Sequence, residues 1–230
     1  MTALYHFWWS PESQSVRLAL GYKTVVFDDQ PVAYDDNETF FRLGVARAVP
    51  VLQHDDGTIE TGAVPILSRI DHRWPTRPVM EGVMTAAGWE ELVTWRGSVQ
   101  ALFARLQAPV FPAYQGIGDS AESLAACKAE ISTRFGASIE ELSNDRYAAF
   151  DQLKGAARLG DLAAHLARNR FYCGRISAAD LLLACDLFPL QLLDGITLPL
   201  DLMYYIRRVE DVCQTSLRDG LLSTWQEPGD

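Results

Sequence analysis

Hydrophobic and polar positions along residues 1–75 follow patterns that predict short strands and helices in turn. Apolar, aromatic or β-branched runs predict strands, and apolar residues on one face predict helices. An Asp55-Asp56-Gly57 turn predicts a hairpin. The expected strands cover residues 3–9, 24–27, 49–54 and 58–61, and the expected helices follow Ser10 and cover 39–45 and 63–72. This β-α-β-α-β-β-α order predicts a small mixed sheet flanked by helices.

The pattern changes between Trp74 and Pro78, where two prolines in five residues predict a linker. From there, apolar positions recur mostly at helical spacing. Helices are expected at 83–106, 121–142, 146–169, 177–193 and 199–214, and the tail from Trp225 to Asp230 is expected to be loose. The chain is therefore predicted to be α+β, with an N-terminal domain at 1–74, a linker at 75–82 and an all-helical domain at 83–230.

One helix start has a clear local signal. Ser177 and Asp180 have the spacing of a capping box, with Asp where Glu or Gln is commoner. Ile176 and Leu181 stand where a hydrophobic staple would form. The run from Leu181 to Leu190 is apolar almost all round. This helix is therefore expected to run through the middle of the helical domain.

Composition and charge exclude several classes of protein. The 230 residues are 48% hydrophobic and 22% charged, which suits a sizeable core and excludes global disorder. Lys plus Arg total 20 against 30 Asp plus Glu, a net charge of -10 without any basic run, so neither nucleic acid nor an anionic membrane is an expected partner. The sequence has neither a signal segment nor the roughly 18–20 apolar residues of a membrane span, which favours a cytoplasmic protein.

The cysteines and histidines form no metal-binding or redox motif. Cys127, Cys173, Cys185 and Cys213 lie far apart in the second half of the chain, without a CxxC pair. The four histidines are scattered and include no HExxH motif. A metal site is therefore not expected.

Four local motifs follow one another along nearly the whole chain. They are Ser10–Leu20, Val49-Pro50-Val51-Leu52, Asp56-Gly57 with residues 64–71, and Tyr172-Cys173-Gly174 with Ser177–Asp180. In this order they resemble the cytosolic glutathione S-transferase superfamily, of bacterial type with a serine-class-like N-terminal motif. The resemblance implies a thioredoxin-like N-terminal domain, an all-helical C-terminal domain and a cis bond before Pro50.

The resemblance places Ser10 beside the thiol of glutathione, as the catalytic residue. A free thiol has a pKa of about 8.5, and a hydroxyl at a helix N-terminus can stabilise the thiolate by hydrogen bonding and by the helix field. Ser13 is the alternative, because a cysteine-type class has its key residue nearer to that position. Without the resemblance, both serines are ordinary loop and N-cap residues. Phe7 stands where tyrosine classes tend to carry tyrosine, which argues against a tyrosine mechanism.

The resemblance also implies how glutathione would be held. The main chain of Val49, next to Pro50, would pair with the cysteinyl part like an added strand. The family's acid-serine pair, which holds the γ-glutamyl carboxylate, falls on Gly62 and Ala63, which lack both side-chain groups. One missing hydrogen bond to a charged group costs about 1.5–3 kcal/mol, so weak or altered glutathione binding is predicted. The upstream Glu60-Thr61 pair is a less favoured substitute.

Two functions stay open. One is a transferase that conjugates or otherwise activates glutathione toward a small apolar electrophile, with glutathione as co-substrate. The other is a non-catalytic binding or scaffolding protein. A third possibility is a glutathione-dependent isomerase or reductase. An isomerase would use a serine, whereas a thiol reductase would need a cysteine near residue 10, and none stands there. The resemblance alone implies a homodimer.

Several helical-domain residues are candidates for an electrophile pocket, although aromatic residues at helical spacing are more typical of a core. They are Trp89, Trp95, Arg96, Phe103, Phe111 and Tyr114. In the N-terminal domain, Arg47 is interpreted as a surface charge.

Overall fold

The structure, a computed structural model, describes residues 1–225, and the tail 226–230 of the segment expected to be loose lies outside the described residues. The N-terminal elements occur in the predicted order. They are β1 (Ala3–His6), α1 (Pro11–Tyr22), β2 (Asp28–Pro31), α2 (Glu38–Leu43), β3 (Val51–Gln53), β4 (Ile59–Thr61) and α3 (Ala63–Arg73).

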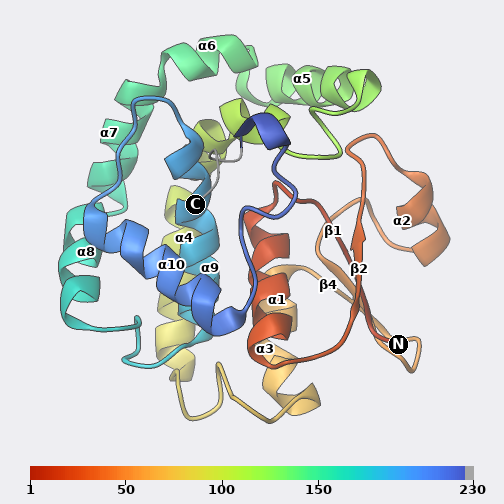
Figure 1. The fold of residues 1–230 in the computed structure, drawn as a ribbon, viewed down its shortest axis with the longest axis vertical. Coiled ribbons are helices and arrows are strands. Elements are labelled where there is room, and N and C mark those ends of the chain that lie inside the picture. Colours follow the sequence, from red (N-terminus) through yellow and green to blue (C-terminus); the bar gives the residue numbers. More distant parts are fainter. Residues whose placement is uncertain (226–230) are drawn as a thin grey trace.

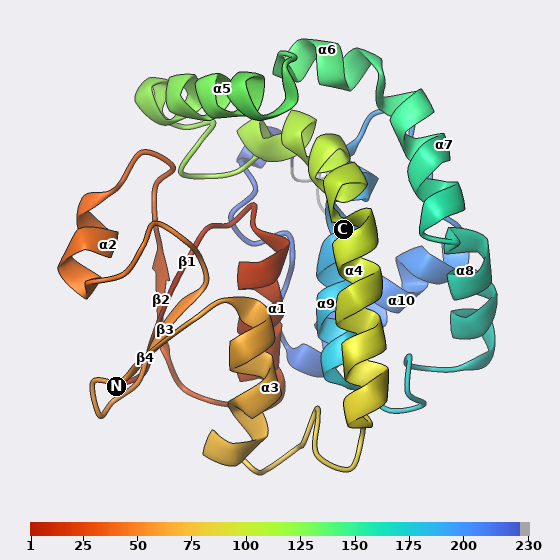
Figure 2. The same ribbon diagram turned by 180° about the vertical axis from the view of Figure 1, so that it is seen from behind.

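The four strands form one mixed sheet in the order β2-β1-β3-β4. β1 pairs in parallel with β2 and antiparallel with β3, and β3 and β4 form the predicted hairpin. α1 and α3 cover one face of the sheet, while α2 lies on the opposite side (Figure 1 and Figure 2). This is the predicted thioredoxin-like arrangement.

The strand predicted at 24–27 is wrong: β2 is formed by residues 28–31 instead. Thr24 has a φ of 55° in the turn after α1, and Val26 is 82% exposed. Pairing with β1 begins only at Asp28. β2 is an edge strand, so its polar side chains and Pro31 are tolerated despite their low strand propensity.

Helices dominate the rest of the chain, as predicted. They are α4 (Ala86–Gln107), η1 (Ala108–Ala113), α5 (Ala121–Phe135), α6 (Ile139–Asn144), α7 (Arg146–Ala156), α8 (Leu159–Arg168), α9 (Ala178–Leu187), η2 (Phe188–Leu192), α10 (Leu200–Cys213) and η3 (Ser223–Trp225). None of the helices within the described residues is long and apolar enough to cross a membrane.

Two helices expected to be continuous are each divided in two. Gly136, with a φ of 65°, caps α5 in the left-handed conformation and separates it from α6. Arg158, with a φ of 51°, separates α7 from α8. The left-handed region ends a helix, and its occupancy by an arginine gives no signal in the sequence.

α9 is the central helix of the molecule. Every one of its residues is buried, and it packs against α1 on one side and α10 on another. Figure 1 and Figure 2 show α1 between the sheet and α9. The predicted capping pair is confirmed, because the N–H and Oγ of Ser177 both donate to the Asp180 carboxylate, at 2.8 and 2.6 Å.

Candidate functional site

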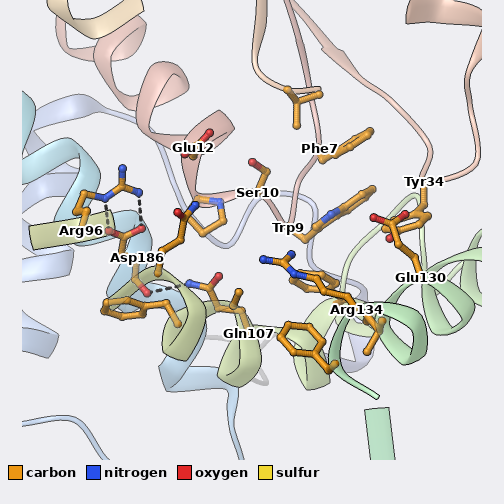
Figure 3. Close-up of a pocket in the computed structure, with 18 of the residues that line it drawn as sticks. Phe7, Trp9, Ser10, Glu12, Tyr34, Arg96, Gln107, Glu130, Arg134 and Asp186 are labelled. Carbon is orange, nitrogen blue, oxygen red and sulfur yellow. Dashed lines mark hydrogen bonds and ion pairs between the residues drawn. The ribbon is translucent and has the colours of Figure 1, made fainter. Parts of the chain in front are cut away.

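A cavity of about 430 Å³ lies where the N-terminal end of α1 faces α4, α5 and the end of α9. Its lining combines residues far apart in the sequence, from Phe7 to Asp186. Figure 3 shows Ser10 and Glu12 on the α1 side, with Gln107 and Arg134 across the space. The cavity therefore lies between the thioredoxin-like part and the helical part.

Ser10 lines this cavity as the N-cap of α1. Its backbone is extended, and its Oγ accepts a hydrogen bond from the N–H of Ser13 at 3.2 Å. A hydroxyl that accepts one bond still has its own proton to donate. Because Oγ makes no other hydrogen bond within residues 1–225, Ser10 can cap the helix and donate to a ligand at the same time.

Ser13, the alternative to Ser10, lies deeper. It is fully buried, and it does not line the cavity. Its Oγ has no hydrogen-bond partner in the described part of the chain. Of the two serines, Ser10 is the one that faces the cavity.

Val49 also lines the cavity, next to the start of β3. The expected cis bond between Val49 and Pro50 is present. Within residues 1–225, the N–H and C=O of Val49 bond neither main chain nor side chains. Both groups are therefore available to a ligand with an extended backbone.

The N-terminus of α3 has no side-chain group that could hold a charged ligand. Gly62, with a φ of 82°, is its N-cap, and Ala63 is 1% exposed. Neither residue lines the cavity, although the next residue, Val64, does. Pro65 at the third position has no N–H, which leaves only the amides of Ala63 and Val64 without intrahelical partners.

Glu60 and Thr61 do not take the place of the missing pair. Both lie within β4. The carboxylate of Glu60 bonds His54 at 3.1 Å and Arg69 at 2.8 Å. Glu60 therefore has other partners.

Aromatic side chains form one wall of the cavity. Phe7 and Trp9 stack with ring centroids 4.4 Å apart and an interplanar angle of 12°. Tyr34 and Phe111 lie near Trp9, at 5.4 and 6.4 Å between centroids. Phe7 has no hydroxyl, so this wall is a surface for apolar or aromatic groups.

A buried ion pair lies near the other end of the cavity. The Arg96 guanidinium makes two bonds to the Asp186 carboxylate, at 2.7 and 2.8 Å, and Gln107 donates to the main-chain O of Asp186 at 3.2 Å (Figure 3). Glu12, at the second position of α1, lines the same region. Burial raises the pKa of Glu12, Arg96 opposes that rise, and Asp186 adds to it.

Arg47 is exposed, as predicted for a surface charge, but it also has specific partners at the cavity. It lines the cavity, donates to the main-chain O of Tyr34 and pairs with Glu130 at 3.4 Å. Its guanidinium also lies 4.9 Å from the Tyr34 ring centroid. These contacts hold the Arg47 side chain at the rim of the cavity.

The proposed pocket residues divide between cavity and core. Arg96, Phe103 and Phe111 line the cavity, whereas Tyr114 is fully buried. Trp95 lines a second cavity, of about 680 Å³, between α4 and α8. Trp89 packs against the core outside both cavities.

The sequence interpretation missed several polar residues of the site. They are Glu12, Gln107, Glu130, Arg134 and Asp186. Glu12 alone has a local signal, because it is an acid in the first turn of a helix that Ser10 caps. Within residues 1–225, no group of three His, Cys, Asp or Glu side chains could hold a metal ion.

Comparisons with known proteins show which proteins this chain is similar to. Residues 4–78 match the family model "Glutathione S-transferase, N-terminal domain". No curated protein matches.

Several solved structures have the same fold. Glutaredoxin 2 from Salmonella typhimurium, in complex with glutathione, has a TM-score of 0.77 at 20% identity, covering 94% of this chain and 96% of its own. A glutathione S-transferase of Ceriporiopsis subvermispora, in complex with glutathione, has a TM-score of 0.72 at 15% identity, covering 92% and 97%. A glutathione transferase of Phanerochaete chrysosporium has a TM-score of 0.71 at 16% identity, covering 94% and 99%. Residues 4–78 therefore match the N-terminal domain of the glutathione S-transferase family, and the chain as a whole shares the two-part fold of these structures.

Proposed function

We propose that this protein binds glutathione at the N-terminal end of α1, stabilises its thiolate with Ser10, and transfers it to a small electrophile in the cavity. The observation that carries the proposal is Ser10, whose hydroxyl proton is free and which lines the cavity at a helix N-terminus. Val49, with its unused main-chain groups, would align the cysteinyl part of glutathione.

The chemistry needs only modest stabilisation of the thiolate. A thiol with a pKa near 8.5 is ionised only to a few per cent at pH 7. The positive N-terminal end of α1 and the Ser10 hydroxyl would both favour the anion, although Pro11 has no N–H and the N–H of Ser13 bonds Ser10. None of the four cysteines, all in the described residues, lines the cavity, so the sulfur would come from the bound thiol.

Ser10→Gly tests the thiolate role. Glycine costs an N-cap only a few tenths of a kcal/mol, so the helix start survives while the hydroxyl is lost. Losing a hydrogen bond to an anion costs about 1.5–3 kcal/mol, so the pKa of the bound thiol should rise by about one to two. Ultraviolet absorbance of the thiolate, titrated with pH in the presence of glutathione, measures this.

Ser13→Ala is the matched control and should leave the titration unchanged, because Ser13 does not line the cavity. The reverse result, with Ser13→Ala raising the thiol pKa and Ser10→Gly leaving it unchanged, assigns the role to Ser13 instead.

Ala63→Ser tests the holding of the γ-glutamyl carboxylate. The new hydroxyl at the start of α3 should add one hydrogen bond to a charged group and raise affinity for glutathione about 10- to 150-fold. Calorimetric titration of both proteins with glutathione measures the gain. Ala121→Ser is a suitable control, because Ala121 is also the first residue of a helix, but the residue after it does not line the cavity as Val64 does after Ala63. Equal affinity for all three proteins would mean that glutathione does not meet the start of α3.

A non-catalytic binding or scaffolding protein is the second candidate, and Gly62-Ala63 is the observation that favours it. In that case neither the natural protein nor Ala63→Ser would bind glutathione at millimolar concentration. Binding at tens of micromolar, together with a lowered thiol pKa that depends on Ser10, would exclude this reading.

Assembly and location complete the proposal. We expect a cytoplasmic homodimer, which light scattering would report as a mass near twice the 25.6 kDa of one chain. A mass of one chain at micromolar concentration would contradict the dimer.

A further inference from the structure

Six charged side chains line the cavity between α1 and the helical part: Glu12, Arg47, Arg96, Glu130, Arg134 and Asp186. Four of them are neutralised in pairs. Arg96 holds Asp186 with two bonds, and Arg47 lies 3.4 Å from Glu130. The other two charged residues of the lining, Glu12 and Arg134, make no ion pair with any residue in 1–225.

The two remaining charges lie in different regions of the cavity. Glu12, on the first turn of α1, is near the Arg96–Asp186 pair, which acts on its pKa. Arg134 lies near the end of α5, and its guanidinium is 5.1 Å from the ring centroid of Phe135. Figure 3 shows the Arg134 guanidinium turned toward Trp9 and away from Glu130. The cavity is therefore negative near Glu12 and positive near Arg134.

The aromatic wall lies beside the positive region. Trp9 is 5% exposed, stacks on Phe7 and lies close to Phe111. A planar aromatic ligand can lie against such a wall, while an anionic group on its edge pairs with the guanidinium. Glu12 would repel the same anionic group from the other region, which fixes the direction of the ligand.

We propose that the second substrate is an aromatic electrophile that carries a carboxylate, and that Arg134 binds this carboxylate. The catalytic part rests on the function proposed above, whereas the binding part does not. In the reaction, the glutathione sulfur forms a bond to the ring carbon, the bond from that carbon to halide breaks, and the halide leaves with the electron pair. No oxidant or reductant is needed.

A matched pair of substrates tests the proposal. 4-Chloro-3,5-dinitrobenzoate and 1-chloro-2,4-dinitrobenzene undergo the same displacement, but only the first carries a carboxylate. The natural protein should have the higher kcat/KM for the benzoate, relative to each uncatalysed rate. Arg134→Gln should reduce that preference about 10- to 150-fold by removing a charge-assisted bond.

Arg170→Gln is the matched control. Arg170 also stacks on the phenylalanine that follows it, at 5.6 Å from the centroid of Phe171, but it lies outside the cavity. Arg170→Gln should prefer the benzoate over 1-chloro-2,4-dinitrobenzene as strongly as the natural protein does. Equal preference in Arg134→Gln and the natural protein would overturn the proposal.

Binding without glutathione separates this proposal from the proposed function. 3,5-Dinitrobenzoate should quench Trp fluorescence at lower concentration than 1,3-dinitrobenzene, and Arg134→Gln should remove the difference. If this holds while no conjugation occurs, the transferase function fails and the anion site stands. If Arg134→Gln instead weakens glutathione binding and leaves both dinitro compounds unaffected, Arg134 serves glutathione and the proposal fails.

Discussion

Asp180→Ala should lower the free energy of unfolding by about 3–5 kcal/mol, because it removes a fully buried carboxylate that accepts hydrogen bonds from several donors. The carboxylate accepts from the N–H and Oγ of Ser177, at 2.8 and 2.6 Å. It also accepts from the N–H of Tyr172 at 2.7 Å and the hydroxyl of Tyr205 at 2.8 Å. Alanine would leave the buried N–H of Ser177 and the partly buried N–H of Tyr172 without these partners.

Loss of the Asp180 carboxylate would also affect the cavity, because α9 connects the two. Asp180 fixes the start of this helix, and its last turn carries Asp186, which holds Arg96 in the cavity. Burial raises the pKa of Asp180, and the bonds from Ser177, Tyr172 and Tyr205 work against that rise. These bonds compensate in part for the cost of burying the charge.

Urea unfolding followed by circular dichroism measures the effect. Asp180→Asn should lose less than Asp180→Ala, because the amide oxygen still accepts hydrogen bonds. Asp161→Ala is the matched control: Asp161 is an acid in the first turn of α8, but its pair with Arg158 is exposed. The control should change stability by less than about 1 kcal/mol. Equal losses at Asp161 and Asp180 would contradict the buried network.

Local patterns in the sequence predicted the elements whose causes are local. The capping pair Ser177 and Asp180 is separated by three positions and needs no tertiary information. The hairpin at Asp56-Gly57 is equally local. β2 was misplaced because the strand is chosen by its pairing with β1 rather than by β-branched composition.

In the site, too, residues within local motifs could be predicted from the sequence, whereas residues that meet only in the folded molecule could not. Ser10 and the Val49-Pro50 bond lie in contiguous motifs, and the structure places Ser10 and Val49 at the cavity. Arg96 and Asp186 are separated by 90 positions and meet only because α4 packs on α9. The periodicity of one helix says which face is buried, but it does not say which partner lies opposite. Arg134 was missed for that reason.

Lys23 at the end of α1 and Asp71 in the last turn of α3 form a buried pair. The Lys23 side chain is 0% and the Asp71 side chain 1% exposed, with 2.6 Å between Nζ and the carboxylate. Nζ also donates to the main-chain oxygens of Trp74, Thr76 and Arg77, at 2.7, 3.2 and 3.3 Å.

Asp71 fixes the continuation of the segment after α3, because it accepts from three successive amides. They belong to Val79, Met80 and Glu81, at 3.1, 2.7 and 2.8 Å. The residues between α3 and α4 are therefore held by the two charged side chains, although they form no helix or strand. This sets how α4, which carries Arg96, is placed against the thioredoxin-like part.

Burial alone would raise the pKa of Asp71, but the bonds from Lys23 and the three amides outweigh it and lower the pKa. A carboxyl whose folded pKa lies below its unfolded value stabilises the fold above about pH 4. That contribution is lost as the pH falls through the folded value. Removing Lys23 raises the folded pKa, so acid unfolding should begin at a higher pH.

Lys23→Met should therefore destabilise the protein by about 3–5 kcal/mol at pH 7, because it leaves a buried carboxylate without its counter-ion. It should also release the segment that begins at Trp74, so trypsin would cut faster after Arg73, the last residue of α3, as gel electrophoresis of timed digests can show. Lys154→Met is the matched control, because Lys154 makes an exposed pair with Asp151 at 3.4 Å. Exposed pairs contribute about 0–1 kcal/mol. If both variants unfold at the same urea concentration and the Arg73–Trp74 bond stays protected, the amides alone hold Asp71, and the pair does not determine how the two parts of the molecule are joined.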